Sequence, residues 1–425
     1  MSSLAESSLA KSNLAESSSA ERASAPRLTE SRGASGAQAW HSVTVSREIA
    51  AVEADWHAIE ARALVTPYQA YGWVRAFVET VGAADGMDFR HVVVRDAASE
   101  PLAILPLVIT RRNGIRFAEF IGGKHANYHM GLYAPAFAAA LDAGAARLLL
   151  SEISAAIGRL DAFIFVNQPT QWQGLANPLA ALAAGPSPSG AYKLALVSGD
   201  CDGTLRRSMS SHAHKKLKNK RNRFTGFGPS ALVRAHSPAE IARVIDAFLL
   251  QKAARFRMMG LPDPFASPAV RAFIERAAQP DGDRPAVLEL YSLDLAGHSV
   301  ATYVGAVQAT RFSGMATSFD MESEAARTSP GEILLVDLIK LKCREGITVF
   351  DLGVGEARYK TTICDERDEL VDSFLPLTAK GHAFTGIARA KRWAKRRIKA
   401  SPAALKLAHR VSGWLNRGRA RTVED

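Results

Sequence analysis

The order of the predicted secondary-structure elements, which occurs twice along the chain, most constrains the fold. Each copy begins with two patterns of apolar residues at helical spacing and continues with three strand-like runs separated by turn residues. A helix and then a short apolar strand complete each copy. The repeated order predicts a duplicated α/β module of roughly 150 residues per copy, and a chain of 425 residues can contain two of them.

These patterns also predict where the elements lie. A Ser-Pro-Ala-Glu sequence at 237–240 is a capping box with proline at the first helical position, so it marks a helix start in the second copy. In the first copy, strands are expected at 89–94, 102–109, 115–121 and 162–166, with the helix at about 135–158. In the second copy, strands are expected at 286–293, 300–307, 312–319 and 348–352, with the helix at 331–344.

Composition predicts the ends of the two modules and the boundary between them. The N-terminal stretch repeats a Ser-Leu-Ala-Glu-Ser theme in which leucines lie five residues apart, a spacing that cannot form one apolar stripe on a helix. It therefore predicts a disordered tail, with a transient, solvated helix as the alternative. The expected divisions are a disordered Ser/Ala-rich tail over 1–38, an N-terminal half over 39–200, a C-terminal half over 201–378 and a basic amphipathic helical tail over 379–425.

The net charge of +11 is concentrated in two segments. Thirteen Lys/Arg and only two acidic residues occupy 380–425, while eight Lys/Arg and no acidic residue occupy 204–230. The remainder of the chain is therefore net acidic, which argues against a uniformly basic nucleic-acid-binding protein, and no specific nucleic-acid partner is expected. In the C-terminal segment, apolar stripes accompany the Lys/Arg clusters. This pattern is typical of a helix that contacts an anionic membrane, here over 385–415, and equally of a helix that docks on the protein body.

Other classes of protein are disfavoured by what the sequence lacks. It has no run of about 18 apolar residues, which a membrane-spanning helix needs, and its N-terminus does not have the pattern of a secretory signal. Three widely separated cysteines, Cys201, Cys343 and Cys364, predict neither a disulfide framework nor a Cys-x-x-Cys metal site, and they fit a reducing cytoplasm. No further ligands accompany His212 and His214, so no metal is expected.

The ends of the last two strands in the second copy are the best candidates for a functional site. The third strand ends at Asp320, the fourth ends just after Asp351, and between them a helix starts at Ser329-Pro-Gly-Glu332. Because ligands bind at the carboxyl ends of parallel strands, where the next helix presents its N-terminal amides, we expect the two carboxylates to flank this helix start. Such a site suits a phosphate-bearing cofactor and a general base. The alternative is an ordinary helix start and a carboxylate that caps a loop.

Four short motifs, in order and at compatible spacings, carry a resemblance to a known family. They are LKNKRNRF at 217–224, SFD at 318–320, SPGEILL at 329–335 and FDLGVGEARYK at 350–360. With these motifs the chain resembles the CelD/BcsL type of cellulose-biosynthesis acetyltransferase, which belongs to the GNAT (acyl-CoA N-acyltransferase) superfamily. The resemblance implies an α/β fold of two tandem GNAT-like modules, each a mixed sheet flanked by helices. It also implies transfer of an acetyl or other acyl group from acyl-CoA to an amine or hydroxyl of a small molecule or glycan, in polysaccharide or cell-envelope glycan biosynthesis.

For the cofactor, the resemblance places the CoA diphosphate against the helix start formed by Ser329, Pro330, Gly331 and Glu332. Proline and glutamate stand here at two positions where the superfamily's phosphate loop has Gly and Gly/Ala. Lys360 is expected to pair with a phosphate or with the acceptor. The first half has no comparable phosphate-binding helix start, so we expect it to shape the cleft without binding CoA.

Catalysis of acyl transfer needs a base for the acceptor's proton and a donor for the leaving thiolate. We expect Asp320 or Asp351 to be the base, with Glu356 as the third candidate, and Tyr359 to be the donor. The alternative for Tyr359 is an aromatic residue in a surface loop. The basic run at 206–223 either is a solvated helix face or lines the cleft, where it would attract the polyanionic end of CoA or an acidic acceptor.

Two other functions remain open. A FemAB-like aminoacyl transferase would share the doubled fold and use aminoacyl-tRNA, which a basic cleft also suits. A non-catalytic scaffold would keep the GNAT fold without its chemistry, as the altered phosphate loop allows. In each case we expect a cytoplasmic protein, peripheral at the inner membrane face if the basic tail binds lipid.

Overall fold

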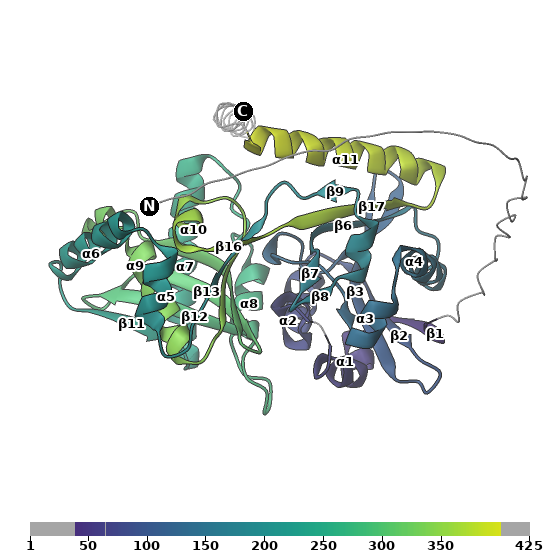
Figure 1. The fold of residues 1–425 in the computed structure, drawn as a ribbon, viewed down its shortest axis with the longest axis horizontal. Coiled ribbons are helices and arrows are strands. Elements are labelled where there is room, and N and C mark those ends of the chain that lie inside the picture. The colour runs from purple at the N-terminus through teal and green to yellow at the C-terminus, as the bar shows by residue number, and fades with distance from the viewer. Residues whose placement is uncertain (1–38, 64, 401–425) are drawn as a thin grey trace, which may run out of the picture. The chain divides into compact units, whose positions relative to one another are not determined.

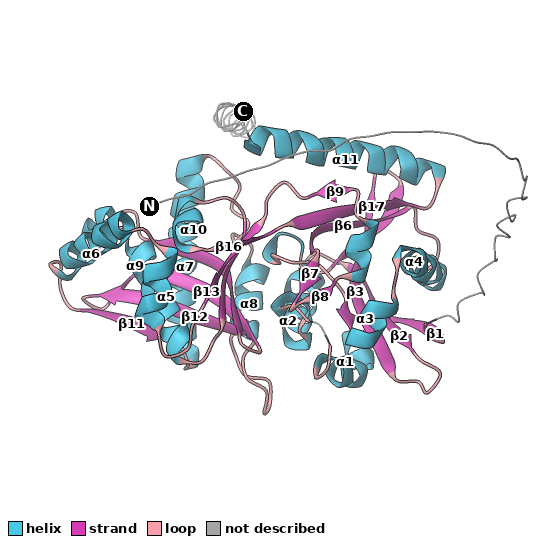
Figure 2. Ribbon diagram, viewed as in Figure 1, coloured by secondary structure: helices cyan, strands magenta, loops and turns pink. Residues whose placement is uncertain are grey.

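The computed structural model describes residues 39–63 and 65–400. The predicted tail over 1–38 and the last part of the basic tail, 401–425, lie outside the described residues. Two mixed β-sheets with helices packed against them make up the described part (Figures 1 and 2). This arrangement confirms the predicted class, an α/β fold of mixed sheets flanked by helices.

The first sheet is antiparallel except at one pair of strands. Its strand order is β1 (Ser42–Ser46), β2 (Asp88–Arg95), β3 (Pro101–Arg112), β4 (Ile115–Phe120), β6 (Ala162–Pro169), β17 (Leu370–Pro376) and β9 (Gly185–Pro186), and β5 (Leu132–Tyr133) pairs with β3. The helices of this half are α1 (Glu53–Glu60), α2 (Tyr71–Phe77), a π-helical turn η3 (Val78–Gly82), α3 (Pro135–Ala140) and α4 (Ala143–Ile157). A separate hairpin is formed by β7 (Gln171–Trp172) and β8 (Leu175–Ala176). β4 and β6 run parallel because α3 and α4 form the crossover between them.

The second sheet repeats this plan. Its strand order is β11 (Ser230–Arg234), β12 (Leu288–Leu295), β13 (His298–Gln308), β14 (Arg311–Phe319), β15 (Val349–Val354), β10 (Ala191–Ala195) and β16 (Glu366–Asp368). The helices are α5 (Cys201–Ser208), α6 (Ser211–Thr225), α7 (Pro238–Met259), α8 (Pro268–Ala277), a 3₁₀ turn η6 (Glu324–Thr328), α9 (Pro330–Arg344) and α10 (Arg358–Ile363). The predicted capping box is confirmed: the Ser237 side chain accepts from the Glu240 amide, and the Glu240 carboxylate accepts from the Ser237 amide. β14 and β15 are the parallel pair, joined by α9.

The two sheets do not follow the predicted boundaries at 200 and 378, because each sheet includes a strand from the other half. β10 precedes residue 200 but pairs with β15 of the second sheet, and β17 follows the second sheet but pairs with β6 of the first. The two halves also share a core, in which Trp73 and Phe77 of α2 pack edge-on against Phe273 of α8 at ring distances of 5.0 and 5.7 Å. Each half therefore completes the other.

One expectation about the cysteines is wrong. Cys201, the first residue of α5, and Cys343, in the last turn of α9, form a disulfide with a Cα–Cα distance of 5.7 Å. The two residues are 142 positions apart, so their proximity follows from the packing of α5 against α9 and left no local pattern in the sequence. Cys364 is not in a disulfide.

The basic tail begins as one helix, α11 (Ala379–Ala400), which lies alongside β17 (Figure 1). One face docks on the first sheet: the Phe384 ring lies 5.1 Å from Phe117, and Arg392 forms an ion pair with Asp372 of β17. Other apolar side chains point outward, since Ile387 is 57% and Trp393 is 54% exposed. The docking alternative thus holds for one face of α11, and membrane contact by the exposed face stays a prediction. Among the described residues, no helix has the length and apolar character to cross a membrane.

Candidate functional site

The two parallel strands of the second sheet separate soon after they pair. Pairing of β14 with β15 ends at Ser313 and Asp351. Beyond this point the side chain of Asn127, from the first half, lies between them: its Nδ2 donates to the Gly314 carbonyl at 2.9 Å, and its Oδ1 accepts from the Val354 amide at 3.3 Å. A single amide thus bridges the separating strands at their point of divergence.

Asp351 lies beside this point and is completely buried. One carboxylate oxygen accepts from the Tyr128 hydroxyl at 2.9 Å and from the Gly353 amide at 2.7 Å. The other accepts from Arg311 at 2.9 Å and from the Ser313 hydroxyl at 3.0 Å. With both oxygens engaged and the charge balanced by a guanidinium, Asp351 is suited to joining the two halves rather than to taking a proton from an acceptor.

The expectation that Asp320 and Asp351 flank one helix start is wrong. Asp351 is the register partner of Ser313, and Asp320 follows Ser313 by seven residues along β14. At about 3.3 Å per residue this separates the two positions by roughly 23 Å. The register of β14 against β15, which could not be read from the sequence, therefore places Asp351 far from the start of α9, and only Asp320 lies near it.

A cavity of about 210 Å³, here called the α9 pocket, lies at that helix start. The end of β14, the first turn of α9 and single residues of α7, β13 and α10 surround it. Its lining is Arg255, Tyr303, Thr317, Ser318, Phe319, Ser329, Gly331, Glu332, Leu335 and Tyr359. Four of the predicted site residues are thus brought together here: Ser329, Gly331, Glu332 and Tyr359.

The first turn of α9 presents its backbone to this pocket. Ser329 adopts a left-handed conformation with φ of 60°, which turns the chain from η6 into α9. Gly331 is the second residue of the helix, a position whose amide has no intrahelical carbonyl to bond. Pro330 is buried, has no N–H and does not line the pocket. The helix dipole and the Gly331 amide therefore favour an anion at this end.

Ser318 supplies a further polar group that sequence reasoning did not single out. The side chain is only 2% exposed and lines the α9 pocket, yet its hydroxyl has no hydrogen-bond partner within residues 39–63 and 65–398. A buried hydroxyl without a partner is costly, and a ligand that bonds to it would remove that cost. The SFD motif contained this residue, but nothing in the motif shows that its hydroxyl is unpaired.

Tyr359 and Lys360 differ in their surroundings. Burial raises the pKa of Tyr359 to about 12, so its hydroxyl stays protonated at neutral pH and can donate a proton or hydrogen bond. Burial also lowers the pKa of Lys360 to about 8. The Lys360 ammonium donates to the Gly353 and Val354 carbonyls at 3.0 and 3.1 Å, so it holds the end of β15 and does not line the α9 pocket.

The remaining predicted base, Glu356, lies away from the pocket. It is exposed, accepts a hydrogen bond from the Tyr192 hydroxyl, and lies 3.4 Å from Arg367. Asp320 directly follows Phe319 of the lining, and its carboxylate accepts from the Glu322 amide at 2.9 Å. Of the three candidate bases, Asp320 is therefore the one adjoining the α9 pocket.

A second cavity, the α6 pocket, shares Glu332 and Tyr359 with the α9 pocket and measures about 250 Å³. Lys216 and Lys220 of α6 line it, together with His212. Lys220 also forms an ion pair with Glu332. The predicted basic run thus reaches a cavity next to the α9 start, as expected if it lines the cleft.

Comparison with known proteins bears on this region. Residues 211–361 match the family described as "Acetyltransferase (GNAT) domain". The match lies entirely within the C-terminal half and leaves the first half unmatched. The matched region includes the entire lining of the α9 pocket. No curated protein matches the chain.

Solved structures similar to this chain share little sequence identity with it. A conserved protein of unknown function from Bacteroides thetaiotaomicron is 11% identical, with 79% of this chain and 100% of that chain covered and a TM-score of 0.49. FemX is 9% identical, with 78% and 97% covered and a TM-score of 0.48. A tandem GNAT protein from the clavulanic acid biosynthesis pathway is 12% identical, with 79% and 100% covered and a TM-score of 0.43.

Proposed function

We propose that this protein is an acyl-CoA-dependent acyltransferase that moves an acetyl or related acyl group to an amine or hydroxyl. The observation that carries the proposal is the α9 pocket. It brings together a helix start, the unpaired Ser318 hydroxyl and the protonated Tyr359 within the region matched to the GNAT domain. A thioester nucleotide requires a binding site for its phosphates and a hydrogen-bonding group, and its leaving thiolate requires a proton donor.

In this proposal the CoA diphosphate lies at the Gly331 amide, and the cations of the α6 pocket, Lys216 and Lys220, attract the phosphorylated nucleoside. The acceptor nitrogen or oxygen attacks the thioester carbonyl carbon, and the carbon–sulfur bond breaks. Tyr359 gives its proton to the thiolate, and the acceptor's proton goes to Asp320. Lys360 keeps the end of β15 in place rather than binding phosphate.

Isothermal titration tests the proposal against its two rivals. Acetyl-CoA should bind the full-length protein, and Ser318→Ala should weaken binding by roughly tenfold because it removes the unpaired hydroxyl. Thr317→Ser is the matched control, since it keeps a hydroxyl at a neighbouring position of the lining. Binding of aminoacylated tRNA but not acetyl-CoA would favour the FemAB-like transferase, and binding of neither would favour the scaffold.

We further propose that the acceptor belongs to a polysaccharide or envelope glycan and that the enzyme works at the cytoplasmic face of an anionic membrane. The support for the membrane part is the outer face of α11, where exposed Ile387 and Trp393 lie among basic residues such as Arg389 and Arg397. Tryptophan and basic side chains on one helix suit a lipid headgroup layer, with about 1 kcal/mol per Lys or Arg near the surface.

A further inference from the structure

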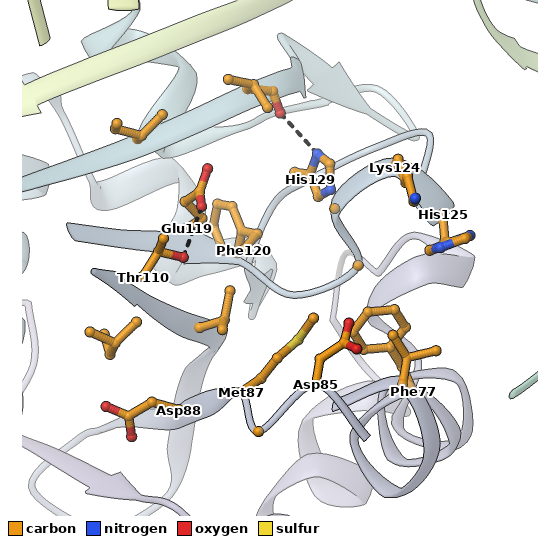
Figure 3. A pocket seen from close by; sticks show the side chains of 18 of the residues that line it. Phe77, Asp85, Met87, Asp88, Thr110, Glu119, Phe120, Lys124, His125 and His129 are labelled. Atoms are coloured by element: carbon orange, nitrogen blue, oxygen red, sulfur yellow. Dashed lines mark hydrogen bonds between the residues drawn. The ribbon is translucent and has the colours of Figure 1, made fainter. Parts of the chain in front are cut away.

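The first half contains a larger cavity than either pocket of the second. It measures about 690 Å³ and begins where β4 and β6 separate, directly beyond their last parallel pair, Ala118 and Phe163. The two halves thus have equivalent openings between parallel strands, and the one in the first half remains wide. Figure 3 shows its wall, in which Met87 and Phe120 alternate with polar side chains such as Glu119. We call this cavity the β4 pocket.

Charge distinguishes the β4 pocket from an anion site. Asp85 and Glu119 line it, and neither forms an ion pair with a described residue. The carboxylate of Asp88, also in the lining, is paired with Arg90. The cations of the lining are Arg111 and Lys124, both at exposed positions. Neither α3 nor α4 contributes its first turn to the lining.

Two histidines add hydrogen-bonding capacity without charge. His125 and His129 line the β4 pocket at 7% and 3% exposure, and burial lowers the pKa of each to about 4. His129 donates from Nδ1 to the Val166 carbonyl at 3.0 Å (Figure 3). Its Nε2 is therefore an acceptor, and no donor within the described parts of the chain bonds to this atom. Buried unpaired nitrogens at a cavity wall indicate a missing ligand donor.

We propose that the β4 pocket binds the acceptor side of the reaction, a non-anionic glycan segment that donates hydrogen bonds through hydroxyl or ammonium groups. Carboxylates and an unpaired imidazole nitrogen accept such bonds, while the apolar walls suit the C–H faces of sugar rings. Amines and alcohols, the two acceptor classes, are both hydrogen-bond donors. The acceptor role rests on the proposed function, but binding itself does not.

One loop connects this pocket to the candidate active site. His125 and His129 belong to the lining of the β4 pocket, while Asn127 and Tyr128, between them in sequence, reach the separating strands of the second sheet. A ligand that contacts these histidines therefore lies against the segment that bridges β14 and β15. This loop links the β4 pocket to the strands that carry the candidate active site.

Three tetrasaccharides of equal length test the proposal without CoA, by saturation-transfer NMR and isothermal titration. The chitosan tetramer and cellotetraose should bind, and tetragalacturonate should bind at least tenfold more weakly because its carboxylates face Asp85 and Glu119. Glu119→Gln and Asp85→Asn should each weaken binding of the chitosan tetramer by roughly tenfold. Asp246→Asn is the matched control, because this exposed carboxylate on α7 lies outside the lining.

Val166→Phe provides a second variant that fills the cavity without changing charge, and it should abolish binding of both non-anionic sugars. Tighter binding of tetragalacturonate, or no saturable binding of either other sugar up to about 10 mM, would overturn the proposal. Acetyl-CoA titrations of Glu119→Gln separate the two hypotheses. Unchanged CoA binding together with lost sugar binding supports the acceptor pocket. If the parent protein does not bind CoA, the proposed acyl transfer is wrong, and the sugar-binding result still decides whether the β4 pocket binds a glycan.

Discussion

Glu332 is the residue whose replacement tests the placement of CoA most directly. Its carboxylate lies in the first turn of α9, lines both pockets and pairs with Lys220, with 42% and 17% of the two side chains exposed. Two charges about 6 Å apart represent that carboxylate and a phosphate at the Gly331 amide, since Gly331 and Glu332 are adjacent. With an effective dielectric constant of about 40 for a half-exposed site, the repulsion is about 1.4 kcal/mol.

Glu332→Gln should therefore tighten binding of acetyl-CoA by about tenfold, and the freed Lys220 would add to the gain. The same change removes a partly exposed ion pair and a favourable charge at the helix start, so stability should fall by about 1 kcal/mol. Titration at about 50 and 200 mM salt checks the cause, because the gain should shrink as salt screens the charges.

Asp337→Asn is the matched control for this prediction. Asp337 pairs with Arg221, so it also joins α9 to α6, but it lines neither pocket. It should show a similar small loss of stability without tighter CoA binding. If Glu332→Gln weakens binding, or if both variants change it equally, the diphosphate does not lie at the α9 start.

Three further predictions concern other parts of the molecule. Tyr359→Phe should lower kcat by roughly 10²–10⁴-fold. Because the Tyr359 pKa is about 12, this group should cause no alkaline fall in kcat below about pH 11, and a fall near pH 9 that the variant abolishes would contradict its role. Cys343→Ser removes the α5–α9 disulfide and should lower the free energy of unfolding by up to about 5 kcal/mol, which a lower melting temperature would show. Equal melting temperatures of the oxidised and reduced parent protein would disprove this. Replacing Ile387 and Trp393 with serine should abolish flotation with phosphatidylglycerol vesicles, whereas Leu250→Ser, exposed on α7, should not.

The elements that the sequence predicted well are those whose signals are local. Alternating apolar residues placed β2, β3 and β4 and their counterparts β12, β13 and β14, and the capping box placed the start of α7. β10 and β17 illustrate the limit of this reasoning. Each is a strand of five to seven residues whose apolar side chains suit either sheet, so only the three-dimensional packing decides that each joins the sheet of the other half.

The candidate site was predictable to a similar extent. A Ser-Pro-Gly-Glu helix start and the tyrosine that follows β15 do meet in one pocket. The role of Asp351 was not predictable, because it depends on register with Ser313 and on Tyr128 from the other half. Ser318 shows the same limit, since whether a hydroxyl lacks a partner depends on every neighbour it has in space.

These contacts also bear on whether the second half can act alone. A fragment over 201–378 would lose β10, which separates β15 from β16, and would carry β17 without its partner strands. It would also lose Tyr128, so the buried Asp351 would lack one of its donors, and Asn127, so the separating strands would lose their bridge. A buried carboxylate deprived of a partner destabilises its surroundings by about 1–3 kcal/mol. The first half therefore supports β14 and β15, the strands on either side of α9, and a chain that keeps both halves is the smallest unit in which these contacts are complete.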